Sequence, residues 1–125
     1  MRQLVQLVAR RPYAPWRRAG DLVVVSGQLG TVPGSGPLAF VEGGAPAQLR
    51  QALTNGQSVL AEAGASLADV VKTTLFLTDI DQFGPCNEVW LEFFDDPLPT
   101  RSAFAVAALP YGALAEVEFW AYKPL

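Results

Sequence analysis

Apolar residues in several parts of this sequence are spaced as in β-strands. The clearest is a β-branched run that is apolar on both faces and closes at a glycine, Asp21–Gln28. Four further runs are also predicted to be strands, and the shortest precedes the first proline. The predicted strands are Gln3–Val8, Asp21–Gln28, Asp69–Asp79, Ser102–Leu109 and Leu114–Tyr122, the last two joined by a turn at Pro110-Tyr111-Gly112.

The strand predicted over Asp69–Asp79 alternates between two faces. Because successive side chains of a strand point to opposite sides, its residues divide into two sets. We expect one face to carry Val71, Thr73, Leu75 and Leu77, and the other to carry Val70, Lys72, Thr74 and Phe76.

Two other segments have the three- and four-residue spacing of amphipathic helices. The first begins near Ala45, tolerates Pro46 in its first turn and stops at Gly64. We expect Asp81 to cap the second helix, which ends at Asp95–Pro99. The apolar stripes are Leu49, Ala52, Leu53, Gly56, Leu60 and Ala63 in the first helix, and Phe83, Cys86, Trp90, Phe93 and Phe94 in the second. The glycine at position 56 predicts a close approach to a sheet.

This order of elements predicts an α+β fold in one domain over residues 1–125, with both helices on one face of a sheet. Residues 31–44 are expected to form turns and loops around a short segment, Leu38–Val41. Several strands are apolar on both sides, whereas two helices can cover only one. The second face would be a large exposed apolar patch, so we expect a homo-oligomer packed sheet to sheet.

Composition excludes several classes of chemistry. The 125 residues include no histidine and one cysteine, which argues against zinc or haem sites and against histidine general bases. A lone cysteine favours a reducing, cytoplasmic setting. The net charge is -3, which argues against a nucleic-acid binder, although five of the nine basic residues precede residue 19. That stretch resembles a transit peptide in charge, but its prolines favour folded structure. No apolar run is long enough to span a membrane.

Glu116 and Glu118 are candidates for acid/base chemistry because they are two residues apart on one predicted strand. They should therefore share a face with Trp120 and Tyr122. Aromatic neighbours and a second carboxylate would both raise the pKa of a glutamate towards a useful range. The alternative is a solvated polar face of an outer strand.

Arg101 is a candidate anion-binding residue, since it follows Pro-Leu-Pro-Thr and opens a strand of small residues that includes Ala103. A rigidly held guanidinium binds a carboxylate through two parallel hydrogen bonds. The alternative is an ion pair with Asp95 or Asp96. Asn87 lies on the apolar side of the second helix, where its amide needs a partner, either a ligand or nearby backbone.

Three further residues are of interest near the predicted site. Ser26 and Gly27 end a hydrophobic strand, where backbone can approach a ligand, or they form an ordinary turn. Tyr13, between Pro12 and Pro15, is either a pocket lid or simple packing. Cys86 is expected to be unreactive core.

These segments together resemble the RidA (YjgF-type) family of reactive-intermediate deaminases, from about Tyr13 to the C-terminus. The Ser-Gly-Gln, Val-Lys-Thr-Thr and Pro-x-Arg-Ser signatures are specific when they occur in this order. The matching stretches are Pro12-Tyr13, Gly20–Leu22, Val25–Leu29, Gln51–Leu53, Val70–Asp79, Asn87–Trp90, Pro99–Ser102 and Ala108–Glu118.

The resemblance implies a chorismate-mutase-like fold and a homotrimer with ligand clefts between subunits. It also implies hydrolysis of enamine and imine intermediates such as 2-aminoacrylate to 2-oxo acids and ammonia, without metal or organic cofactor. Arg101 matches the arginine that holds the substrate carboxylate, and Glu116 matches the glutamate that positions or activates water. The pocket-lining positions match Tyr13, Ser26, Gly27, Asn87 and Ala103.

Two departures from the family pattern affect the expected substrate more than the reaction. Ala14-Pro15-Trp16 replaces the usual residues after Pro-Tyr, and Ala103 stands where cysteine is common. The contact at position 103 is largely made by backbone. Trp16, Trp90 and Trp120 would reshape the pocket if they face it. A non-catalytic metabolite-binding or chaperone-like protein on the same scaffold is the alternative function, and a ribonuclease is disfavoured by the acidic balance and the absent histidines.

Overall fold

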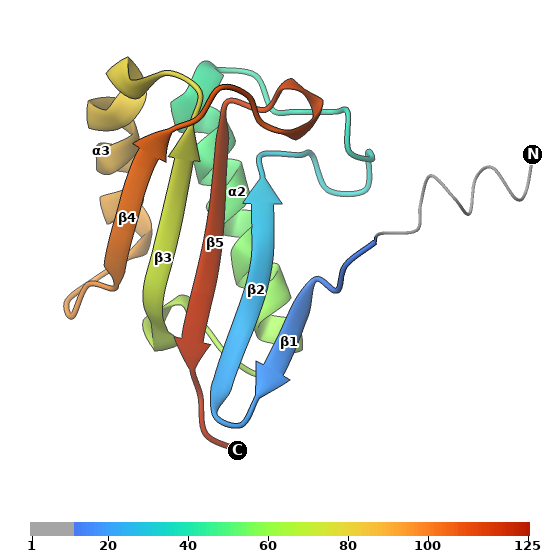
Figure 1. The fold of residues 1–125 in the computed structure, drawn as a ribbon, viewed down its shortest axis with the longest axis vertical. Helices are drawn as coiled ribbons and strands as arrows, with labels where there is room; N and C mark the ends of the chain where they lie inside the picture. Colours follow the sequence, from blue (N-terminus) through green and yellow to red (C-terminus); the bar gives the residue numbers. More distant parts are fainter. Residues whose placement is uncertain (1–11) are drawn as a thin grey trace, which may run out of the picture.

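The computed structural model describes residues 12–125, and in them a mixed five-stranded sheet forms the framework (Figure 1). The strands run in the order β1-β2-β5-β3-β4, and β3 and β4 are parallel while the other neighbours are antiparallel. The predicted strand Gln3–Val8 lies outside the described residues. The strands are β1 (Trp16–Ala19), β2 (Leu22–Leu29), β3 (Val70–Leu77), β4 (Thr100–Ala105) and β5 (Ala115–Tyr122).

Both long helices cover the same face of this sheet, as predicted (Figure 1). They are α2 (Gly44–Glu62) and α3 (Phe83–Phe93). The α2 helix ends before Gly64, whose φ of 78° is a left-handed conformation that suits glycine. A side chain at Gly56 would overlap the ring of Phe119, which confirms the predicted close approach of helix and sheet. The core between the layers includes Val23, Val25, Leu49, Leu53, Leu60, Leu75, Leu77, Val117 and Phe119.

The structure corrects the predicted arrangement of the last two strands. β4 ends at Ala105 rather than Leu109, and it is not next to β5, because β3 lies between them. The crossover through α3 brings β4 back parallel to β3, which places β4 at the edge of the sheet. The strand β1 at the opposite edge was not predicted, since its four residues are too few to show a pattern.

Two local predictions were also wrong. The pairing of β3 with β5 is irregular between Val70 and Lys72, so Val70 rather than Val71 faces the core with Thr73. A bulge of this kind shifts the alternation by one residue. Asp79, not Asp81, caps the entry to α3: its side chain accepts a hydrogen bond from the Asp81 amide at the start of a short 3-10 turn, Ile80–Gln82.

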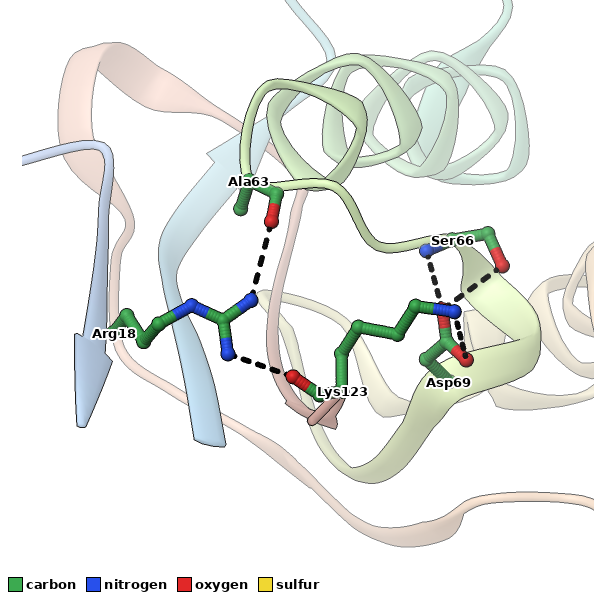
Figure 2. Close-up of polar contacts among 5 residues, drawn as sticks. All are labelled: Arg18, Ala63, Ser66, Asp69 and Lys123. Carbon is green, nitrogen blue, oxygen red and sulfur yellow. Dashed lines mark hydrogen bonds and ion pairs between the residues drawn. The ribbon is translucent and has the colours of Figure 1, made fainter. Parts of the chain in front are cut away.

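Strand β1 is tied to the rest of the fold by Arg18 (Figure 2). Its guanidinium donates to the carbonyl of Lys123 at 2.6 Å and to the carbonyl of Ala63, beyond the end of α2, at 3.4 Å. The Lys123 ammonium lies 3.8 Å from Asp69, whose carboxylate also accepts from the amide and hydroxyl of Ser66. One edge strand, the end of a helix and the end of β5 are therefore held together.

The sheet face opposite the helices, here called the open face, mixes aromatic and polar side chains. Phe76 and Phe104 meet edge to face there, with ring centroids 5.2 Å apart. Phe104, Trp120 and Tyr122 are exposed in the single chain. No helix in residues 12–125 has the length and apolarity needed to cross a membrane.

Candidate active site

Glu116 lies on the open face, near the start of the central strand β5. Ala115, Val117, Phe119 and Ala121 are buried against the helices, so the alternating residues Glu116, Glu118, Trp120 and Tyr122 share the open face, as predicted. Glu116 is half-buried. Burial raises the pKa of its carboxyl group above the usual value, and the charge of Glu118 raises it further. Glu116 therefore holds a proton more readily than an ordinary surface glutamate.

Gly27 makes room for the Glu116 carboxylate. The ladder between β2 and β5 is irregular between Val25 and Gln28, where one extra residue of β2 is accommodated. A methyl group placed on Gly27 would overlap the carboxylate of Glu116. Glycine is thus required here for the close approach of a side chain rather than for an unusual backbone angle.

The segment that carries Tyr13 is attached to the same place by backbone contacts. The Ser26 hydroxyl donates to the carbonyl of Ala14 at 2.6 Å, and the Ser26 amide donates to the carbonyl of Pro15 at 3.0 Å. Any residue supplies such carbonyls, so the departure of Ala14-Pro15 from the family pattern leaves these contacts intact. Trp16 packs on the core. We call Ser26, Gly27 and Glu116 the carboxylate half-site; Tyr13 precedes the attached residues, and its side chain is exposed in the single chain.

Two polar side chains of α2 hold the strand ends next to Glu116. The buried Gln48 side chain accepts from the amide of Leu114, immediately before β5, at 2.8 Å. The Asn55 amide donates to the carbonyls of Leu29 and Thr31, each at 3.0 Å. Neither residue is among the predicted site residues, although their seven-residue spacing beside the apolar stripe of this helix is a usable signal.

Arg101 lies on edge strand β4 and points to the helix side of the sheet. Its register partner is Thr73, which is fully buried on that side. The guanidinium donates to the side-chain oxygen of Asn87 at 2.8 Å, and its central carbon lies 5.3 Å from the ring centroid of Phe83 and 5.0 Å from that of Trp90. Burial lowers the pKa of Arg101 from its usual value.

Arg101 has no carboxylate partner among residues 12–125, so the predicted alternative of an ion pair with Asp95 or Asp96 is wrong. Ala103, two residues further along β4, faces the same side and packs on the core. We call Arg101, Asn87 and Ala103 the guanidinium half-site.

Cys86 is adjacent to this half-site but is chemically quiet. Its side chain is completely buried, and burial raises the pKa of the thiol to about 11, against a smaller opposing effect of the Arg101 charge. At neutral pH it is therefore protonated. Within the described part of the chain, no group of three or more histidine, cysteine or acidic side chains could hold a metal ion.

The two half-sites do not meet within one chain. Glu116 pairs with Phe76, whereas Arg101 pairs with Thr73, three residues earlier in β3. The two are therefore displaced by about 10 Å along the strands. They are also two strands apart, about 10 Å across the sheet, and point to opposite faces. The structure therefore brings Glu116 together with Gly27, and Arg101 together with Asn87, but it keeps the two charges apart.

Comparison with known proteins identifies the family. The family model described as Endoribonuclease L-PSP matches residues 4–123. A protein named 2-iminobutanoate/2-iminopropanoate deaminase from Mus musculus is 41% identical over 107 residues, covering 86% of this chain and 78% of the relative. The protein of the same name from Rattus norvegicus is 46% identical over 96 residues, covering 77% and 69%.

Solved structures agree with this result. The crystal structure of RidA from an Antarctic Psychrobacter superposes with a TM-score of 0.85 at 38% identity, covering 91% of this chain and 90% of the other. That of TdcF from E. coli with bound serine gives 0.82 at 35% identity, covering 92% and 91%. These are α+β proteins of the L-PSP type, and the chain belongs to this RidA/YjgF family. The resemblance inferred from the motifs is confirmed.

Proposed function

We propose that this protein hydrolyses reactive enamine and imine intermediates of the 2-aminoacrylate type to 2-oxo acids and ammonia. The expectation of a deaminase-type enzyme is confirmed by the names of several relatives that are 40% identical or more over most of the chain. The substrate, the roles of the residues and the assembly are our proposals.

One observation carries the proposed substrate class. Arg101 is a half-buried cation whose neighbours are an amide and two aromatic rings, all of them neutral. A desolvated guanidinium with donors still available favours a planar anion such as a carboxylate. In a 2-imino acid, the carbon next to the carboxylate forms the carbon–nitrogen bond that is hydrolysed. Serine bound to the TdcF relative is likewise a small molecule with a carboxylate.

Glu116 supplies the proton transfers that hydrolysis needs. A water molecule adds to the carbon of the imine, whose nitrogen is protonated, and loses a proton to the Glu116 carboxylate, giving a neutral carbinolamine. The same carboxyl group then returns the proton to the nitrogen, and the carbon–nitrogen bond breaks. As ammonia leaves, the hydroxyl proton passes back to the Glu116 carboxylate and the 2-oxo acid forms. A raised pKa suits a group that must alternate between base and acid near neutral pH.

We propose that the complete site forms between subunits of a homotrimer. The separation of Glu116 from Arg101 within one chain supports this arrangement, because a small substrate cannot bridge two faces of a sheet. The aromatic groups exposed on the open face, Phe104, Trp120 and Tyr122, support packing of that face against another copy. The edge strand β4 of one subunit would bring Arg101 to the carboxylate half-site of the next.

Ammonia release tests the activity. 2-Aminoacrylate is generated by a pyridoxal-dependent serine dehydratase, and ammonia is followed with and without this protein. We expect faster release with it. No acceleration, together with retained calorimetric binding of pyruvate, would favour the alternative function of a metabolite-binding protein.

Mixing of variants tests the shared site. Arg101→Ala and Glu116→Gln subunits are unfolded together and reassembled. If each site takes Arg101 from one subunit and Glu116 from its neighbour, about a quarter of the sites in a random mixture regain both residues. Recovery of activity in the mixture supports the intersubunit site, and its absence at a light-scattering mass near three chains of 13.4 kDa contradicts it.

We further propose a cytoplasmic location and a partner range limited to small 2-imino and 2-oxo acids. The buried free thiol of Cys86 is compatible with a reducing compartment. The net charge of -3 does not favour an RNA substrate, despite the endoribonuclease name of the family model. An RNA-cleavage assay run beside the ammonia assay tests this: cleavage that survives Glu116→Gln would contradict the proposal.

A further inference from the structure

The guanidinium of Arg101 lies against three residues of one helix. Phe83, Asn87 and Trp90 are at positions i, i+4 and i+7 of α3, so they form one stripe that faces β4. Seven residues of helix span about 10.5 Å. The central carbon of Arg101 is 5.3 Å from the Phe83 ring and 5.0 Å from the Trp90 ring, so the cation sits about midway between the two rings, opposite Asn87.

We propose that Phe83 and Trp90 are positioning residues that hold Arg101 in its ligand-binding orientation before the ligand arrives. This inference deepens the proposed function, because it concerns the residue assigned to the substrate carboxylate.

The chemistry of the two rings explains why they suit this task better than an acid. A nearby aspartate would also stabilise the cation, but it would occupy the donor edges that a substrate carboxylate needs. Aromatic faces attract the cation through their quadrupole and accept none of its conventional hydrogen bonds. Only one donor of Arg101, the one bonded to Asn87, is engaged among the described residues. The remaining donors stay available.

Phe83 offers the clean test of this arrangement. Trp90 is 5% exposed, so its truncation would leave a cavity, whereas Phe83 is 36% exposed and can be changed without emptying the core. Phe83→Leu keeps apolar bulk and removes the aromatic face. Phe83→Tyr keeps the face. Phe93→Leu is the matched control, because it is the same substitution on the same helix, at a residue that packs on the core.

The first measurement is binding of 2-oxobutanoate by calorimetry, with kcat and KM for imine hydrolysis. We expect Phe83→Leu to raise Kd and KM about threefold to tenfold with kcat nearly unchanged, since a positioning cation–π contact contributes on this scale. Phe83→Tyr should restore both values, and Phe93→Leu should lower Tm without weakening binding. Equal weakening in Phe83→Leu and Phe93→Leu would overturn the proposal, because it would show only a loosened helix.

The second measurement does not depend on the proposed function. The Nε–H signal of Arg101 is followed by NMR without ligand. Two rings at this distance should shift it and slow its exchange, and Phe83→Leu should reduce both effects while Phe93→Leu leaves them in place. An unchanged signal in Phe83→Leu would overturn the positioning role of the rings. Failure of the unmutated protein to bind 2-oxobutanoate, with the signal behaving as expected, would contradict the proposed function and leave the positioning role standing.

Discussion

Glu116 and Arg101 are both partly buried charges, but the fold holds them in different ways. Glu116 is on the central strand β5, which has a neighbouring strand on each side, and the missing side chain of Gly27 leaves room for its carboxylate. Arg101 is on edge strand β4, which has one neighbouring strand, and side chains of α3 hold it.

Under the proposed function, the contrast is between two ways in which one sheet holds a charge for a ligand. Burial raises the pKa of Glu116 and lowers that of Arg101, so each group is shifted towards its neutral form. An ion pair within the chain would relieve both shifts. The proposed substrate, a 2-imino acid, carries a carboxylate for Arg101 and a protonated nitrogen for Glu116.

The largest expected effect separates the roles of the two charges. Glu116→Gln keeps the shape and hydrogen bonding of the side chain but cannot accept and return a proton. Imine hydrolysis should fall by roughly 10²-fold or more, the usual scale for loss of a general acid/base. Binding of 2-oxo acids by calorimetry should remain. Glu118→Gln should lower the rate of imine hydrolysis much less. Full activity in Glu116→Gln would contradict the proposed mechanism.

Arg101→Lys tests the role of the guanidinium group in this comparison. It keeps the charge but loses the planar fork and its fit between the rings of α3. We expect most activity to be lost, by about 10-fold to 10²-fold in kcat/KM, mainly through KM. Circular dichroism should show an intact fold. Normal turnover in this variant would reassign Arg101 to a structural role.

Gly27→Ala probes the backbone-built half-site without altering either charge. The added methyl group must displace the Glu116 carboxylate, so we expect activity to fall about tenfold, in line with the sensitivity of proton transfer to geometry. Gly84→Ala is the matched control, because a side chain there meets open space. An active Gly27→Ala protein would show that Glu116 can act from another position.

The raised pKa of Glu116 also predicts a smaller effect on stability. A carboxyl group whose pKa is higher in the folded chain favours folding when protonated, and that contribution is lost as pH rises through the folded value. Glu116→Gln should therefore melt above the unmutated protein at pH 8 and close to it at pH 4, at equal protein concentration. A difference in melting temperature that grows towards low pH would contradict the raised pKa of Glu116.

Cys86 should give the smallest effect. With a thiol pKa of about 11 and no exposure, it should react with iodoacetamide only after unfolding. Mass spectrometry of the native and denatured protein measures this. Rapid labelling of the native protein would show that the guanidinium half-site opens to solvent.

The sequence was sufficient to predict those parts of the molecule that depend on local spacing. Alternation along β5 predicted that Glu116 shares a face with Trp120, and helical spacing predicted the buried face of α2. The neighbours of β4 could not be predicted in this way, because strand order depends on how α3 crosses the sheet rather than on residues within β4. The separation of Arg101 from Glu116 was missed for the same reason.

Residues that act through long-range contacts were also difficult to predict. Asn87 was singled out, but its partner could not be named until β4 was placed beside α3. Gly27 was expected near a ligand, whereas its contact with Glu116 depends on one extra residue in β2. Burial patterns indicate which side of an element faces the core. They do not indicate which elements become neighbours.

The extra residue in β2 also determines which changes in chain length this protein can tolerate. Deleting either Ser26 or Gly27 would make the β2–β5 ladder regular with Gln28 still opposite Val117, and it would remove the irregularity that leaves room for the Glu116 carboxylate. An insertion in the loop before α2 would leave this pairing and the Glu116 carboxylate undisturbed. Single-residue deletions should therefore be excluded at residues 26–27 and accepted at residues 33–38. The chain length can vary in the loop after β2 but not at the irregular pairing within β2.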